Sequence, residues 1–348
     1  MIKGDDAVTK IRLEVTSKLT MELHDKFSSF TGYGIYHTPQ WHNHLKSTFG
    51  WNVKGIIGYH ADQTPVLFIP FVSKLRLNKW ENISLPLSHK VGIVYDPNYL
   101  SDADLFDLPI HSVLNQIEIR DAVNLKGTVS VNQNVTTGID LREFASVEDY
   151  YSKLDYKRVR YEINRAERNN VRVVDNPTER QIQDFFNLVA ETRHRQGTPL
   201  YPPKMFINLA KVFSGTDYVK LYLGYYQDIP VSANCFYYYG NCATYAYSAS
   251  TNDKELKSLG SNEFVMWYAI QEAFKRQMDF LDFGTSPISL PGLTAFKEKW
   301  GGKTIPLPYT IYSPAKEVKG ITRASEAIKL VSKILQKLPI PVCKFISP

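Results

Sequence analysis

One pattern occurs twice in the chain. The segment VKGIIGYHADQTPV occupies 53–66 and VKLYLGYYQDIPV occupies 219–231, so Val-Lys, Gly-Tyr, Asp and Pro-Val recur in the same order with one gap. Upstream of each segment a proline, a leucine and a phenylalanine keep a matching spacing: Pro39, Leu45 and Phe49, then Pro203, Leu209 and Phe213. A period this long predicts a duplicated domain. The alternative is chance similarity between two hairpins, because Gly, Asp and Pro are ordinary turn residues.

Each copy predicts a helix, a strand ending in Gly-Tyr, a turn and a second strand, so 36–95 and 201–250 should form the same unit. After the second copy the pattern predicts two alternating strands, a helix and a further strand. This order predicts an α/β fold, of the α+β kind with a mixed sheet. We expect two tandem domains and a basic, amphipathic C-terminal helix or tail, with the limits 1–145, 146–315 and 316–348.

Composition narrows the class of protein. The three cysteines form no CxxC pair, which is typical of a reducing cytoplasm and argues against structural zinc. His37, His42 and His44 cluster, but their spacing does not suit a metal site and no acidic residue accompanies them. The N-terminus has no apolar signal segment, and the run PVLFIPFV is too short to span a bilayer. We expect a cytoplasmic protein without a metal site.

A loop before a predicted helix is the first candidate site, for a donor or its phosphate. Lys257, Gly260, Ser261 and Asn262 stand where the free N–H groups of the helix would lie, and such groups bind phosphate. Three of these residues loosely resemble the R/Q-x-x-G-x-G/A loop with which GNAT acetyltransferases hold the pyrophosphate of coenzyme A. The alternative is an ordinary left-handed turn and helix cap.

A basic helical stripe is the second candidate. In YKRVRYEINRAERNNVR, Arg158 and Arg165 share one predicted helix face with Tyr161, Arg168 and Arg172. Cations beside an aromatic ring can hold phosphates. The alternative is a solvated face on which glutamates pair with the arginines.

Four segments together resemble one family. They are YPPKMF, LGYYQDIPVSA, LKSLGSNEFVMWYAIQEA and FGTSPISLPGLTAFKEKWGGK. In combination they resemble the Fem-type (FemAB-like) transferases, duplicated GNAT-fold proteins that include peptidoglycan-bridge aminoacyltransferases and relatives acting on envelope polysaccharides. The resemblance covers 36–312 and is strongest from 150 onward. It implies that both tandem domains are GNAT-like and that Phe296 and Lys297 line an acyl-transfer site.

Lys297 suits this role chemically. Acyl transfer to an amine builds an oxyanion on the attacked carbonyl, which a positioned cation stabilises. We expect the loop 284–292 and the following helix to wall a groove into which Lys297 reaches. The general base stays open between Asp282, Glu263 and a substrate phosphate. The alternative is a solvated lysine beside a tryptophan, Trp300, that only fills the core.

Tyrosines and Trp300 could line a groove for a sugar or peptide. The candidates are Tyr201, Tyr247 and Trp300. The alternative is that the tyrosines are half-buried strand residues.

The resemblance implies an acyltransferase that acts on an amine of a cell-envelope precursor, either of peptidoglycan or of a polysaccharide. The donor would be an acyl-CoA or an aminoacyl-tRNA, with tRNA as a partner in the second case and no permanently bound cofactor. A relative that binds a glycan or peptide without catalysis is the alternative function. Ligand binding separates the two: acyl-CoA, charged tRNA, or a saccharide alone.

Positive charge is concentrated at the C-terminal end. The chain has a net charge of +6, of which residues 316–348 supply +5. Residues 323–338 predict an amphipathic helix with a row of lysines: Lys329, Lys333 and Lys337. Such a helix either docks on its own domain or lies on an anionic lipid surface. The second reading predicts peripheral contact with the inner face of the membrane.

Overall fold

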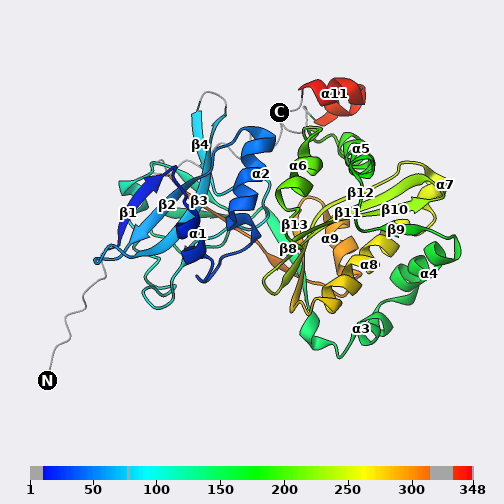
Figure 1. The fold of residues 1–348 in the computed structure, drawn as a ribbon, viewed down its shortest axis with the longest axis horizontal. Helices are drawn as coiled ribbons and strands as arrows, with labels where there is room; N and C mark the ends of the chain where they lie inside the picture. The colour runs from blue at the N-terminus through cyan, green and yellow to red at the C-terminus, as the bar shows by residue number, and fades with distance from the viewer. Residues whose placement is uncertain (1–10, 77–78, 314–331, 347–348) are drawn as a thin grey trace. The chain divides into compact units, whose positions relative to one another are not determined.

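The structure, a computed structural model, describes residues 11–76, 79–313 and 332–346 (Figure 1). The described chain divides into two compact units. The first holds the residues up to 46, residues 50–133 and residues 307–313, and the second holds 47–49, 134–306 and 332–346. Each unit is built on one mixed sheet.

The sheet of the first unit has the strand order β1-β2-β3-β4-β6-β15-β7, with β5 paired to β3. Its strands are β1 (Arg12–Thr16), β2 (Lys54–Tyr59), β3 (Pro65–Arg76), β4 (Lys79–Ile83), β5 (Val94–Tyr95), β6 (Ile117–Ile119), β7 (Thr128–Val131) and β15 (Tyr309–Tyr312). Its helices are α1 (Met21–Phe27), α2 (Pro39–Phe49) and the 3-10 turns Ile35–His37 and Ile110–Ser112. The hydroxyl of Thr38 caps α2 and Pro39 opens it, which fixes where this helix begins.

The sheet of the second unit has the order β14-β8-β13-β12-β11-β10-β9. Its strands are β8 (Asn134–Asp140), β9 (Arg172–Val174), β10 (Val219–Tyr226), β11 (Ile229–Tyr239), β12 (Cys242–Ser250), β13 (Phe280–Pro287) and β14 (Lys303–Pro306). Its helices are α3 (Val147–Lys153), α4 (Tyr161–Arg168), α5 (Glu179–Arg195), α6 (Met205–Val212), α7 (Lys254–Lys257), α8 (Ser261–Lys275), α9 (Pro291–Glu298) and α11 (Ile340–Ile346). Short turns lie at Leu141–Glu143, a 3-10 turn, and at Tyr156–Arg160, a π-helical turn.

The two units share one order of elements. In each, a strand and two helices lead to three antiparallel strands, β2-β3-β4 in the first unit and β10-β11-β12 in the second. The first hairpin of each trio also carries the same bulge. Its pairing shifts between Gly58 and Tyr59 in the first unit and between Gly224 and Tyr225 in the second, and each tyrosine faces a proline. A common bulge argues for duplication over chance, because bulges are specific features of a strand pair.

The last strands of the two sheets are exchanged along the chain. β7 and β8 are neighbours in sequence, yet β7 belongs to the first sheet and β8 to the second. Likewise β14 belongs to the second sheet and β15 to the first. The units therefore change at residues 133/134 and 306/307, whereas the predicted domains change at 145/146 and 315/316. The predicted division would separate β8 from the sheet in which it lies between β14 and β13.

Candidate active site

Lys297 lies on α9, which follows strand β13 after a short loop. A register shift between β13 and β8 leaves Gly284 in a bulge with a φ of 67°, a conformation that glycine adopts readily. The ammonium group of Lys297 donates to the carbonyl oxygens of Gly284 at 2.7 Å and Thr285 at 3.2 Å. The side chain is only 3% exposed. The alternative of a solvated lysine is therefore wrong, while the groove expected beside it stays a prediction.

Asp282 lies on the same bulge. Its carboxylate accepts from the backbone N–H of Gly284 at 2.7 Å and from the hydroxyl of Thr136 on β8 at 2.8 Å. Burial lowers the pKa of Lys297 to about 8, and the charge of Asp282 opposes that shift. The bulge thus holds a buried lysine that is still largely charged at neutral pH, and a carboxylate that fixes the strand around it.

Strands β12 and β13 part beside this bulge. They pair in parallel over three residue pairs, the last being Thr244 with Asp282, and β13 then continues along β8. β12 carries a bulge at the same level, where its pairing with β11 shifts between Tyr245 and Tyr247. On β13, Ser286 is fully buried and its hydroxyl has no hydrogen-bond partner among the described residues. The end of a parallel pair leaves backbone groups that a ligand can use.

The equivalent place in the first unit is filled by its own chain. Strands β4 and β6 pair in parallel only through Ile83 and Glu118. Residues 84–116, all of them described, contain no α-helix, and their loop hydrogen-bonds to β6: Ser84 N–H donates to Glu118 at 2.8 Å and Val91 N–H to Arg120 at 2.9 Å. Only in the second unit do two parallel strands, β12 and β13, separate beside a helix, α8, among the described residues.

The helix that joins β12 to β13 is α8, and carboxylates stand at its N-terminus. Gly260, with a φ of 76°, precedes it, and a Cβ there would lie 2.2 Å from the carbonyl oxygen of Glu162 and 3.1 Å from its carboxylate. Glu263 in the first turn forms a largely buried ion pair with Lys299. Ser261 is 2% exposed, Asn262 is half-buried and Lys257 is exposed. Glu162 in turn lies 4.0 Å from Arg165, so both carboxylates at this helix end have a cationic partner.

Two arginines, the half-buried Arg160 and the exposed Arg168, lie beside two exposed tyrosines at the start of α4 and along it. In the π-helical turn, the N–H of Tyr161 donates to the carbonyl of Tyr156, which places the two residues one helical turn apart on the same side. Their rings are 54% and 40% exposed with centroids 6.4 Å apart. The guanidinium of Arg160 lies 5.5 Å from the Tyr156 ring, and that of Arg168 lies 5.8 Å from the Tyr161 ring. We call these four residues the Arg–Tyr array.

The two predicted phosphate ligands on this segment differ in their surroundings. Arg158 is exposed in the π-helical turn, whereas Arg165 lies 4.0 Å from Glu162 in a partly exposed ion pair. The stripe is therefore partly paired, as the alternative expected, and partly open.

The aromatic candidates fall into two groups. Tyr201 and Tyr247 are half-buried and meet edge to face with centroids 5.5 Å apart, and the guanidinium of Arg193 lies 3.9 Å from the Tyr201 ring. Trp300 is completely buried in the core, where Tyr150 donates to its carbonyl at 2.6 Å. Trp300 is therefore a core residue in this structure and not a groove wall. Phe296 packs against the same core under the ammonium group of Lys299.

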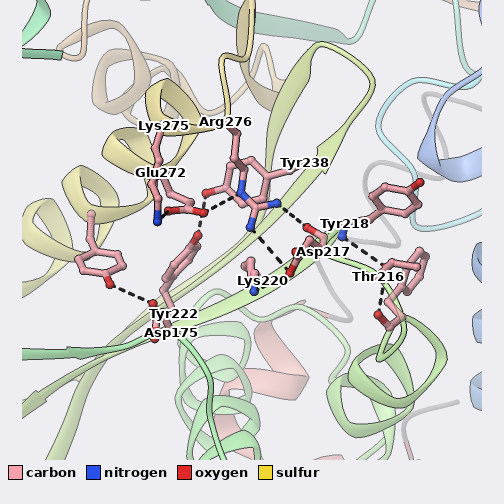
Figure 2. Close-up of polar contacts among 12 residues, drawn as sticks. Asp175, Thr216, Asp217, Tyr218, Lys220, Tyr222, Tyr238, Glu272, Lys275 and Arg276 are labelled. Carbon is pink, nitrogen blue, oxygen red and sulfur yellow. Dashed lines mark hydrogen bonds and ion pairs between the residues drawn. The ribbon is translucent and has the colours of Figure 1, made fainter. Parts of the chain in front are cut away.

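A second polar cluster, at the C-terminal end of α8, is fully paired (Figure 2). Arg276 donates to Glu272 at 2.7 Å and to the carbonyl of Asp217 at 2.8 Å, and Tyr222 and Tyr238 share a hydrogen bond of 2.9 Å. The cluster ties α8 to β10 and β11, so that the helix is held at the end opposite its N-terminus. Because its charges are paired, we assign it a structural role.

The sequence did not indicate two members of the site. Thr136 reaches Asp282 from a strand 146 positions away, and no local pattern announces that pairing. Glu162 faces Gly260 only because α4 packs on α8. Within the described residues, no group of three His, Cys, Asp or Glu side chains is arranged to hold a metal ion.

Comparison with known proteins identifies the class of the second unit. Residues 155–298 match the family described as "Acetyltransferase (GNAT) domain". This span contains the parted strands, α8 and Lys297. The chain is an acyltransferase with a GNAT-type domain. No curated protein sequence matches it significantly.

Solved structures extend the likeness to nearly the whole chain. FemX is similar with a TM-score of 0.66 at 14% identity, covering 92% of this chain and 100% of that one. L-PGS from Bacillus licheniformis is similar with a TM-score of 0.51 at 10% identity over 92% and 98%. A conserved protein of unknown function from Bacteroides thetaiotaomicron has a TM-score of 0.54 at 10% identity over 87% and 99%. The resemblance to Fem-type proteins is confirmed for the fold.

Proposed function

We propose that the chain transfers an acyl or aminoacyl group to an amine of a cell-envelope precursor, at the parting of β12 and β13. The observation that carries the proposal is the buried ammonium group of Lys297 on the bulge of β13. A cation in a water-poor site stabilises a developing oxyanion far better than one in water. Asp282 holds the bulge, and its charge favours the protonated form of Lys297. The experiment that tests this proposal measures transfer of labelled acyl groups to a nucleotide- or lipid-linked precursor.

The donor we favour is an aminoacyl-tRNA. At the N-terminus of α8, the carbonyl and the carboxylate of Glu162 crowd Gly260, which leaves less room for a coenzyme A pyrophosphate. The Arg–Tyr array, by contrast, offers exposed rings for stacking and cations for phosphates, which is the chemistry of single-stranded RNA recognition. A transfer assay with matched acyl-CoA and aminoacyl-tRNA donors tests this choice, and turnover with acyl-CoA alone would contradict it.

Removing the rings of the Arg–Tyr array should weaken RNA binding. We expect the Tyr156→Ala/Tyr161→Ala variant to bind a single-stranded RNA oligonucleotide at least about thirtyfold more weakly, because each stacked base contributes about 1–3 kcal/mol and two rings are lost. Fluorescence anisotropy at fixed salt measures the affinity. Tyr218→Ala is the matched control, since Tyr218 is 38% exposed and lies on another part of the unit. Equal affinity of the double variant and the control would remove the array from the RNA site.

The described part of the C-terminal tail bears on membrane contact. The first part of the predicted helix, 323–331, lies outside the described residues. From residue 332 onward the tail packs on α5: Leu335 is 8% exposed, and the carbonyl of Leu338 lies 2.7 Å from the ring nitrogen of His194. Ile334 and Val342 remain 50% and 43% exposed. The tail thus packs on the second unit with one side and exposes Ile334 and Val342 on another. We propose that these exposed apolar residues contact lipid. None of the helices in the described part of the chain has the length and apolar character that a bilayer crossing requires.

Liposome co-sedimentation tests this contact. We expect the full chain to bind anionic vesicles more than neutral ones, and the Lys333→Glu/Lys337→Glu variant to lose that preference, because each lysine near an anionic surface contributes about 1 kcal/mol. The form stopped at Ala315 should behave like the variant. A matched control is Lys275→Glu, an exposed lysine on α8. If the full chain and the truncated form sediment alike, the membrane contact is wrong.

A further inference from the structure

A cavity of about 300 Å³ lies between helices α3, α4 and α8 in the second unit. Its lining includes no residue of β13 or α9, so it is separate from the bulge that holds Lys297. The residues that give it chemical character are two aromatic rings and three polar groups: Tyr151, Trp267, Glu148, Glu167 and Gln271.

The aromatic wall is formed by Trp267 and Tyr151. Their ring centroids lie 5.0 Å apart and the planes meet at 42°. The hydroxyl of Tyr151 donates to the side-chain oxygen of Asn164 at 2.9 Å, which fixes how the ring is turned. Trp267 is 7% exposed and packs on the core behind it, with Tyr150 at 6.2 Å. The wall is therefore rigid, and the negative faces of aromatic rings attract cations.

The charge of the cavity has one sign. Its charged lining residues are Glu148 and Glu167, and both are acidic. Burial raises the pKa of Tyr151, and the nearby charge of Glu167 raises it further, which places that carboxylate close to the aromatic wall. The guanidinium of Arg160 lies 5.9 Å from the Tyr151 ring, and Arg160 is not part of the lining. An anion would be repelled here, and an apolar group would cover carboxylates without pairing them.

We propose that this cavity binds an alkylammonium group of the kind that a lysine side chain carries. A cation between aromatic faces and carboxylates gains both cation–π and ion-pair attraction. The cavity has the volume of a small-ligand site, enough for an alkyl stem and its ammonium group. The proposal does not depend on the acyl-transfer chemistry, because none of the residues that carry it contacts the bulge.

The test uses Nα-acetyl-lysine amide, with the uncharged Nα-acetyl-norleucine amide as its isostere. The indole N–H signal of Trp267, identified by its loss in Trp267→Phe, is followed by NMR as each probe is added to the full chain. We expect the lysine probe alone to move this signal saturably. Glu148→Gln/Glu167→Gln should weaken the lysine probe about tenfold, and Glu255→Gln, an exposed glutamate on α7, should not.

The Arg160→Met variant is expected to change the affinity for the lysine probe in the opposite direction. Removing this like charge should tighten binding of the lysine probe, in a protein whose circular dichroism matches the wild type. The proposal is overturned if both probes move the signal equally, if neither does, or if the double glutamine variant keeps the wild-type affinity.

Discussion

Replacing Lys297 by alanine is expected to slow acyl transfer by about a hundredfold or more, the usual loss when one stabilising donor is removed from a developing oxyanion. Because burial lowers the pKa of Lys297 to about 8, a rate that depends on its charge should also fall as the pH rises above 8. The Lys297→Arg variant should keep its charge through that range. Initial rates from pH 6 to pH 9 measure both effects.

The burial of Lys297 adds an effect on stability. Alanine would remove the Lys297 donor from the carbonyl oxygens of Gly284 and Thr285, at a net cost of about 0.5–1.5 kcal/mol for each hydrogen bond, while the Thr136 hydroxyl at 3.4 Å still donates to Gly284. The Lys297→Met variant fills a similar volume without charge and is compared with alanine by thermal unfolding. A methionine variant that remains folded and turns over at the wild-type rate would show that the lysine is structural.

Acidification is expected to destabilise the first unit steeply between pH 6.5 and pH 4. Burial lowers the pKa values of His24, His37 and His44 to about 4, and that of His42 well below 6.5. The ring centroids of His24 and His42 lie only 5.0 Å apart, and both rings pack against Phe68. The unfolded chain therefore binds more protons than the folded chain in this range, so stability is present above pH 6.5 and is lost as the pH falls.

The size of this acid effect can be bounded from the two most deeply buried rings. His37 and His44 together should reduce the free energy of unfolding by on the order of 5 kcal/mol at pH 4.5. Thermal scans of the full chain from pH 4.5 to 7 measure it. The His44→Leu variant should show a weaker pH dependence, and the exposed His111→Gln should not. Midpoints that do not change with pH would contradict this account.

The fold was predictable where the signal was local and periodic. Gly-Tyr and the following proline mark the same bulged hairpin in both units, because a strand bulge and its turn are determined by neighbouring residues. The helix after Gly260 was predicted from the sequence pattern, and its Val265 and Met266 are completely buried. The limits of the units were not predictable, since β8 and β15 join sheets through pairings remote in sequence.

The candidate site was predictable in part. Lys297 was predicted as a site residue from the family resemblance. Its burial was not predictable, because the carbonyl groups that accept its hydrogen bonds become available only through the bulge at Gly284. The loop with Gly260 was predicted as a phosphate site or a cap. The structure shows a glycine whose missing side chain makes room for Glu162, a fact of helix packing that sequence spacing does not contain.

The exchange of strands determines the order in which the two sheets can be completed as the chain is synthesised. The second unit is nearly contiguous from 134 to 306, so its sheet is complete once that stretch has left the ribosome. The first unit begins earlier but must wait for β15, which lies between β6 and β7 in its sheet. At ordinary translation rates that delay is roughly 10 to 35 s. During it the edges of β6 and β7 have no partner, and open strand edges are where nascent chains aggregate. The amino-terminal half is therefore the last to be finished.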